Sequence, residues 1–135
     1  MTEELIKQIN DNLRWLDQYV KVDNIVDKGM VLDKLSILCV TLSEQVTEAY
    51  SLMNELEDEY KTATAQVIKD SEKSVNKAEV EAEVMFADKK RDWTKAKNGY
   101  RKLSSYLDRI DKVIESHRQR ISVVKAMGLK NMTGV

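Results

Sequence analysis

Basic side chains gather in one short stretch, Lys89–Lys102, which reads KKRDWTKAKNGYRK. It holds seven lysines and arginines together with Trp93, Tyr100 and the pair Asn98-Gly99. Clustered cations bind phosphates by releasing counterions, and aromatic rings can stack on exposed bases. Nucleic-acid binding is therefore the first hypothesis for this stretch.

The basic residues continue beyond this stretch at helical spacing. Lys95, Lys102 and Arg109 recur every seven residues, so in a helix they lie on one side. The candidate nucleic-acid-binding residues, called here the basic stripe, are Lys89, Lys90, Arg91, Lys95, Lys97, Arg101, Lys102, Arg109, Lys112, Arg118 and Arg120. The alternative is a solvated helix face that pairs with the acidic residues Glu44, Glu48, Glu55, Glu57, Asp58 and Glu59.

The other reactive side chains are isolated in the sequence. His117 is the single histidine and Cys39 the single cysteine, and neither has a second Cys or His at ligand spacing. Phosphate-binding glycine loops, nucleophile elbows and HExxH-type zinc motifs are missing from the sequence. We expect no catalytic residue, no metal site and no cofactor, and hence a protein that is not an enzyme.

The composition and the apolar spacing predict an all-α protein with few, long helices. Proline is absent and glycine occurs four times. We expect a short amphipathic helix over residues 1–22, a break over 21–29, a long antiparallel helical hairpin over 30–127 with its turn near residue 70, and a flexible tail over 128–135 that begins at Gly128. Since no Gly or Pro marks the turn, one uninterrupted helix from about Met30 to Met127 is the alternative.

A heptad pattern is the most regular feature of the second half of the chain. Apolar and aromatic residues alternate at steps of three and four, and we call them the heptad seam: Trp93, Ala96, Tyr100, Leu103, Leu107, Ile110, Ile114, His117, Ile121 and Val124. The seam predicts a helical hairpin with coiled-coil-like packing that associates with other copies as a homo-oligomer. It also assigns Trp93 and Tyr100 to packing before base stacking, and it favours a continuous helix through Asn98-Gly99 over a break there.

Charge and hydropathy narrow the compartment and the partners. Residues 1–67 carry 6 basic and 13 acidic groups, whereas residues 68–135 carry 16 basic and 10 acidic groups. The first half of the chain is therefore net acidic and the second half net basic. A lone cysteine, the lack of a basic-then-apolar leader and the lack of an 18-residue apolar run predict a cytoplasmic protein without a membrane partner.

The closing run from Ala82 to Met127, which includes the sequence IESHRQRI at Ile114–Ile121, resembles the C-terminal part of small phage-encoded recombination mediators of the UvsY type. The resemblance covers the last third to half of the chain. It implies an all-helical oligomer in the host cytoplasm that binds single-stranded DNA and helps a recombinase replace a single-strand binding protein. From this resemblance, Arg118 and its neighbours are candidate DNA-binding residues. The family's short basic motif in mid-chain is not present; the comparable region is Lys61–Ala65, KTATA.

A second function class is compatible with the same pattern. Helices with heptad spacing and charged outer faces also form structural or adaptor proteins. The alternative hypothesis is therefore a coiled-coil protein that mediates protein-protein assembly or inhibits a host protein, without nucleic-acid binding.

Overall fold

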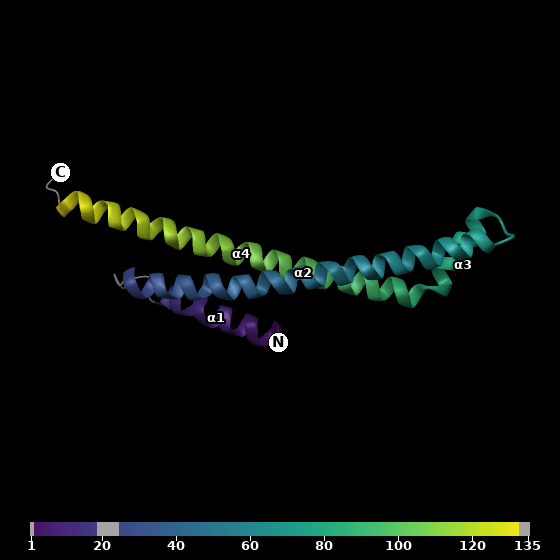
Figure 1. Cartoon of the computed structure of the whole chain (residues 1–135), viewed down its shortest axis with the longest axis horizontal. Helices are drawn as coiled ribbons and strands as arrows, with labels where there is room; N and C mark the ends of the chain where they lie inside the picture. Colours follow the sequence, from purple (N-terminus) through teal and green to yellow (C-terminus); the bar gives the residue numbers. More distant parts are fainter. Residues whose placement is uncertain (1, 19–24, 133–135) are drawn as a thin grey trace. The chain divides into compact units, whose positions relative to one another are not determined.

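The structure is a computed structural model that describes residues 2–18 and 25–132, with side chains described up to residue 128. Within these ranges the regular structure consists of four helices and no strand (Figure 1). They are α1 (Thr2–Gln18), α2 (Ile25–Asp70), α3 (Val75–Met85) and α4 (Ala87–Met132). The two long helices, α2 and α4, pack against each other. The predicted all-α helical hairpin with a short N-terminal helix is confirmed.

The chain forms two compact units. Unit 1 is Met1–Glu44 with Ser105–Val135, and unit 2 is Gln45–Ser104. By sequence, α2 and α4 each contribute one part to unit 1 and another to unit 2. The two units are described separately below.

Unit 1 has a core of aliphatic side chains from three helices. The buried residues are Leu5, Ile9 and Leu16 of α1, Leu32, Leu35, Cys39 and Leu42 of α2, and Ile110 and Ile114 of α4. The α2 set has steps of three and four, which is the spacing of knobs-into-holes packing. Each fully buried Leu or Ile contributes about 1.5–3 kcal/mol. A hydrogen bond of 2.5 Å, donated by Tyr106 Oη to Asn10 Oδ1, also joins α4 to α1.

Unit 2 contains the antiparallel pairing of α2 with α4. Trp93 stacks on Tyr60, with 5.7 Å between ring centroids, and Tyr100 contacts Tyr50 at 5.2 Å. The position on α2 falls from 60 to 50 while the position on α4 rises from 93 to 100, so the two helices run in opposite directions. In α3, Ala78 and Ala82 are buried one turn apart.

The chain reverses in residues 71–74, close to the predicted turn. The Ser71 N–H donates to the Ile68 carbonyl at 3.3 Å, and the Lys73 N–H donates to Ser71 Oγ at 3.1 Å. A serine hydroxyl bonded two residues along the chain stabilises such a turn without Gly or Pro. The alternative of one uninterrupted helix is therefore wrong.

Three helix boundaries differ from the predicted ones. First, α2 begins at Ile25, so residues 25–29 of the expected break, including Gly29, are helical. A glycine in a helix costs about 1 kcal/mol relative to alanine, and the burial of Leu32 and Leu35 in the following turns offsets this cost. Second, α4 passes through Gly128 to Met132, because the backbone at Gly128 does not take the left-handed conformation that ends helices.

The third difference is a break at Phe86 between α3 and α4, where one helix is predicted. Phe86 has φ −110° and ψ 27°, outside the helical region, although its N–H still donates to the Ala82 carbonyl. By contrast, α4 is continuous through Asn98 and Gly99, as predicted. Positions 1, 19–24 and 133–135, which include both ends of the predicted 1–22 helix and the end of the predicted tail, lie outside the described residues.

Candidate nucleic-acid interface

Positive charge is concentrated on the α4 segment of unit 2. Residues 87–104 contain seven basic and two acidic residues. Six of the seven basic residues are exposed, and Lys97 is half-buried. These seven belong to the predicted basic stripe: Lys89, Lys90, Arg91, Lys95, Lys97, Arg101 and Lys102. The helix therefore presents a dense group of cations to solvent.

A shallow hollow of about 820 Å³ lies on the outer side of this helix segment. Four cations border it, namely Lys90, Arg91, Lys95 and Lys102, and Thr94, Asn98 and Gly99 lie between them. At 100° per residue, Arg91, Lys95 and Lys102 fall on the side of α4 opposite Trp93 and Tyr100. The hollow combines cations with a hydroxyl and an amide, which are groups that bind phosphate oxygens.

Most of these cations are free of acidic partners. Arg91 lies 3.5 Å from Asp88, but both side chains are largely exposed, so this ion pair is weak. Within residues 2–18 and 25–128, neither an ion pair nor a hydrogen bond engages the side chains of Lys90, Lys95 and Lys102. Of the six acidic residues proposed as their partners, Glu57 instead pairs with Lys61 at 2.5 Å. The three lysines remain available to an external anion.

The aromatic residues of the opening stretch face inward within unit 2. Trp93 is stacked on Tyr60 with an interplanar angle of 29°, and Tyr100 packs against Tyr50. The ammonium group of Lys97 lies 5.8 Å from the Trp93 ring centroid, within the range of a cation–π contact. The predicted assignment of Trp93 and Tyr100 to interhelical packing is confirmed, and neither ring is free to stack on a base.

The remaining residues of the basic stripe lie in unit 1. Arg118 is engaged with α2, since its Nη2 donates to Ser36 Oγ at 2.8 Å and lies 3.6 Å from Asp33 Oδ1. The guanidinium of Arg109 lies 5.8 Å from the Tyr106 ring centroid. Lys112 and Arg120 are exposed. Arg118, the residue that the family resemblance transfers, thus has an intramolecular role on the surface of unit 1.

The heptad seam packs inside each unit. In unit 2 this is shown by the Trp93 and Tyr100 contacts, with Leu103 half-buried. In unit 1, Ile110 and Ile114 are buried, Leu107, His117 and Ile121 are half-buried, and Val124 is 49% exposed. A single chain therefore already covers most of the seam that is predicted to bind another copy. Self-association stays a prediction.

The two isolated reactive residues are covered within unit 1, since Cys39 is buried and His117 is half-buried. Burial, assisted by the charge of Asp111, raises the pKa of the Cys39 thiol to about 11. Burial lowers the pKa of His117, and Arg120 and Lys28 act in the same direction against Asp17. Three helices thus contribute charges around His117. In the described part of the chain, no group of three His, Cys, Asp or Glu residues could hold a metal ion.

Some residues of the interface carry no distinctive sequence signal. Tyr50 contacts Tyr100 and Tyr60 contacts Trp93. In the sequence, both tyrosines lie within a long helical pattern in which neither position stands out. Thr94 and Asn98 enter the hollow only because α4 is continuous through Gly99. The one signal that could have found them is the helical spacing of Arg91, Thr94, Asn98 and Lys102.

None of the described helices has a stretch long and apolar enough to cross a bilayer. Comparisons with models of protein families, with curated proteins and with solved structures found no match to this chain.

Proposed function

We propose that this protein binds single-stranded DNA through the basic stripe and assists a recombinase, as an oligomeric accessory factor of DNA recombination. The observation that carries the proposal is the hollow on α4, where Lys90, Lys95 and Lys102 lie exposed without an acidic partner in the part of the chain that the structure describes. The family resemblance supplies the recombination context and the cytoplasmic location. No enzyme activity is part of the proposal.

The spacing of the cations supports binding to a phosphodiester backbone. Arg91, Lys95 and Lys102 are separated by four and seven residues, or about 6 and 10 Å along the helix at 1.5 Å per residue. A flexible single strand can adapt its phosphates to such a row, and each contact releases counterions. Because Trp93 and Tyr100 are packed on tyrosines of α2, the affinity should come from phosphates and should be insensitive to base sequence.

The proposal is tested by binding of a fluorescein-labelled oligothymidylate, followed by fluorescence anisotropy. The triple variant Lys90→Gln, Lys95→Gln, Lys102→Gln should bind at least about tenfold more weakly than the unmodified chain. The matched control is Lys7→Gln, Lys34→Gln, Lys69→Gln, which removes the same charge from exposed positions outside the hollow. Equal losses of affinity in both variants would show that the effect depends on net charge rather than on the hollow. An unmodified chain that does not bind the oligonucleotide at low salt would refute the proposal.

The second function class, a protein-binding adaptor, is also favoured by one observation. Large apolar side chains remain exposed on α2 within unit 1, among them Val26 at 71%, Ile37 at 69% and Val40 at 62%. Isolated exposed aliphatic residues are common, but these recur at the spacing of a helical stripe. Protein binding by unit 1 and DNA binding by unit 2 are compatible activities.

A further inference from the structure

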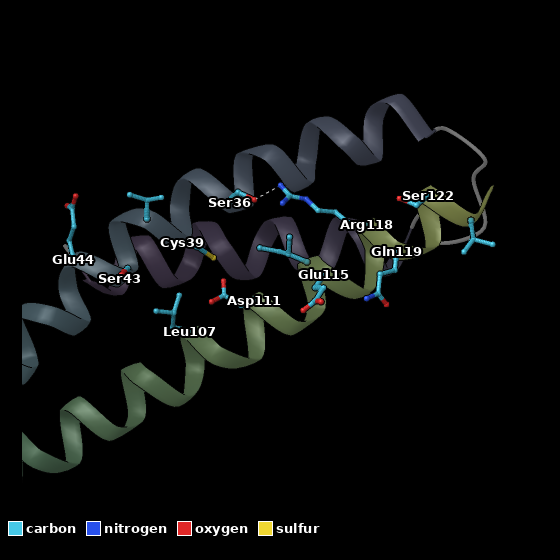
Figure 2. A pocket seen from close by; sticks show the side chains of 13 residues that line it. Ser36, Cys39, Ser43, Glu44, Leu107, Asp111, Glu115, Arg118, Gln119 and Ser122 are labelled. Atoms are coloured by element: carbon cyan, nitrogen blue, oxygen red, sulfur yellow. Dashed lines mark hydrogen bonds between the residues drawn. The ribbon is translucent and has the colours of Figure 1, made fainter. Parts of the chain in front are cut away.

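Unit 1 contains a groove between α2 and α4, with α1 running behind it (Figure 2). The groove has a volume of about 980 Å³. Cys39, Leu107 and Ile114 contribute apolar surface to it, and Val40 and Val123 lie at its edges on α2 and α4. Two helices, α2 and α4, therefore line a groove that is open to solvent, a position in which a further helix can pack as in a bundle.

The edges of the groove are suited to an apolar partner surface. Val40 is 62% exposed and Val123 is 58% exposed, one on each helix. Small side chains, Ser36 and Ser43 on α2 and Ser122 on α4, also line the groove. Small residues allow the backbone of another helix to approach closely, while the valines offer apolar contacts. The shape and the exposed surface therefore fit a helix with an apolar stripe.

The charges that line the groove indicate which charge a bound helix should carry. Glu44, Asp111 and Glu115 contribute three carboxylates to the lining. Among the described residues that line the groove, Arg118 is the single cation. It is turned toward Ser36 and lies within 3.6 Å of Asp33, so its charge is already partly offset (Figure 2). The charge of Asp111 reaches the floor, where it adds to the effect of burial in raising the pKa of Cys39. An occupant with lysines or arginines beside its apolar stripe is complementary to this groove.

Neither the basic segment of α4 in unit 2 nor α1 is such an occupant. The basic segment of α4 in unit 2 already packs its aromatic stripe, Trp93 and Tyr100, on α2. The apolar residues of α1, Leu5, Ile9 and Leu16, are buried in unit 1, and its first turn is acidic. A second copy would therefore have to unfold one of its own helix pairs to offer either of these two faces to the groove, whereas a separate protein would not.

We infer that this groove binds a basic amphipathic helix of a partner protein. The lining residues on α4 extend from Leu107 to Val123, about 24 Å at 1.5 Å per residue, which corresponds to a helix of about 16 residues. Helix-in-groove recognition with anchors at i, i+3, i+4 and i+7 is a common mode of peptide binding. This interaction goes beyond DNA binding, since every lining residue lies in unit 1 and the cations of the hollow lie in unit 2.

The test uses a defined probe, an 18-residue fluorescein-labelled peptide of leucines and lysines with its leucines at i, i+3, i+4 and i+7. Two matched peptides control for charge and shape: one has the same composition in scrambled order, and one has glutamate in place of lysine. The helical basic peptide should bind at least about tenfold more tightly than either control peptide. Equal binding of the scrambled or acidic peptide would overturn the inference.

Variants of the chain identify the site. Glu44→Lys with Glu115→Lys, and separately Val40→Asp, should each weaken binding of the basic peptide by about tenfold or more. Matched controls are Glu48→Lys with Glu55→Lys on the exposed α2 surface of unit 2, and Val84→Asp at a position that is 74% exposed on α3. These controls should change the affinity less than twofold. Helicity by circular dichroism should be the same in all variants, because all the substituted side chains are exposed.

A second measurement localises the peptide without relying on loss of function. Amide chemical shifts of Ser36, Cys39, Ser43 and Ser122 should change on titration with the basic peptide. Changes confined to other parts of the chain would overturn the inference. So would a wild-type chain that is oligomeric, does not bind the peptide and becomes monomeric with Val40→Asp, because a second copy would then occupy the groove. The Lys90, Lys95, Lys102 variant should retain full peptide affinity, which separates this inference from the DNA-binding proposal.

Discussion

Trp93 stacks on Tyr60 with 5.7 Å between their ring centroids and 29° between their planes. This pairing places the largest aromatic ring of the basic stretch against α2, while Lys90 and Lys95 are exposed. The charged and aromatic parts of one stretch thus have different tasks, exposure and packing. Among the described residues the buried Trp93 Nε1–H has no hydrogen-bond partner, so this packing includes an unsatisfied donor.

The buried donor leads to a prediction for stability. Trp93→Phe removes the unsatisfied N–H and keeps an aromatic ring on Tyr60, so its stability should change by less than about 1.5 kcal/mol. Trp93→Ala should lose about 3 kcal/mol or more, since it leaves a cavity beside Tyr60. Urea unfolding followed by circular dichroism measures both values. A loss for Trp93→Phe as large as that for Trp93→Ala would contradict the assignment of Trp93 to packing alone.

The same pairing predicts how DNA affects fluorescence. In a Trp15→Phe background, where Trp93 is the only tryptophan, saturating oligothymidylate should leave the emission intensity nearly unchanged, because Trp93 does not stack on bases. An oligonucleotide with abasic sites should bind within about threefold of oligothymidylate, as expected for phosphate contacts. Strong quenching together with weak binding of the abasic strand would show that bases displace Tyr60.

The core of unit 1 predicts a contrast between two neighbouring positions of α4. Ile110 is 2% exposed, whereas Val113 is 37% exposed. Ile110→Ala should lower the free energy of unfolding by about 2–5 kcal/mol, and Val113→Ala should change it by no more than about 0.5 kcal/mol. Denaturant unfolding measures the pair. Similar losses at both positions would mean that Val113 is covered in solution, for example by another copy of the chain.

His117 predicts a dependence of stability on pH. Its pKa in the folded chain is lowered by burial, by Arg120 and by Lys28, so the unfolded chain binds the proton more readily. The contribution of His117 to stability is fully present above about pH 6.5, the pKa of histidine in the unfolded chain. This contribution is lost as the pH falls below that value. The urea midpoint should therefore fall between pH 7.5 and 5.5 by more in the unmodified chain than in His117→Asn. A steeper fall in the variant would contradict the lowered pKa.

Cys39 predicts slow thiol chemistry. With a pKa of about 11, roughly one thiol in a thousand is ionised at pH 8, and the side chain is 7% exposed. Reaction with a disulfide reagent should be slow in the native chain and should become fast in urea. Rapid labelling of the native chain would show that the groove opens as far as its floor.

The sequence predicted the features that depend on periodicity. The seam residues from Trp93 to Ile121 are buried or half-buried within the chain, whereas Val124 is exposed. The reversal lies near residue 70, although only serines mark it. Helix ends were predicted less well, because Gly29 and Gly128 are tolerated in helices when neighbouring turns hold the backbone. The break at Phe86 has no Gly or Pro, so composition could not identify it.

The candidate site was predicted in part, for a similar reason. Spacing alone placed Lys95 and Lys102 on one outer side of the helix. It could not show that Arg118 is held by Ser36 and Asp33, because that contact depends on how α2 and α4 pair in unit 1. The groove of unit 1 was not predicted. Nothing in the spacing of Val40 and Val123, the apolar residues at its edges, distinguishes them from other apolar residues in the sequence.

The salt dependence of single-strand binding tests the central claim most directly. For the unmodified chain, the logarithm of the association constant for oligothymidylate should fall linearly with the logarithm of the salt concentration. For Lys90→Gln, Lys95→Gln, Lys102→Gln the slope should be shallower by about 2, since each lost single-strand phosphate contact removes about 0.7. The Lys7, Lys34, Lys69 control should keep the slope of the unmodified chain. A slope that is the same in all three proteins would contradict phosphate binding by the hollow on α4.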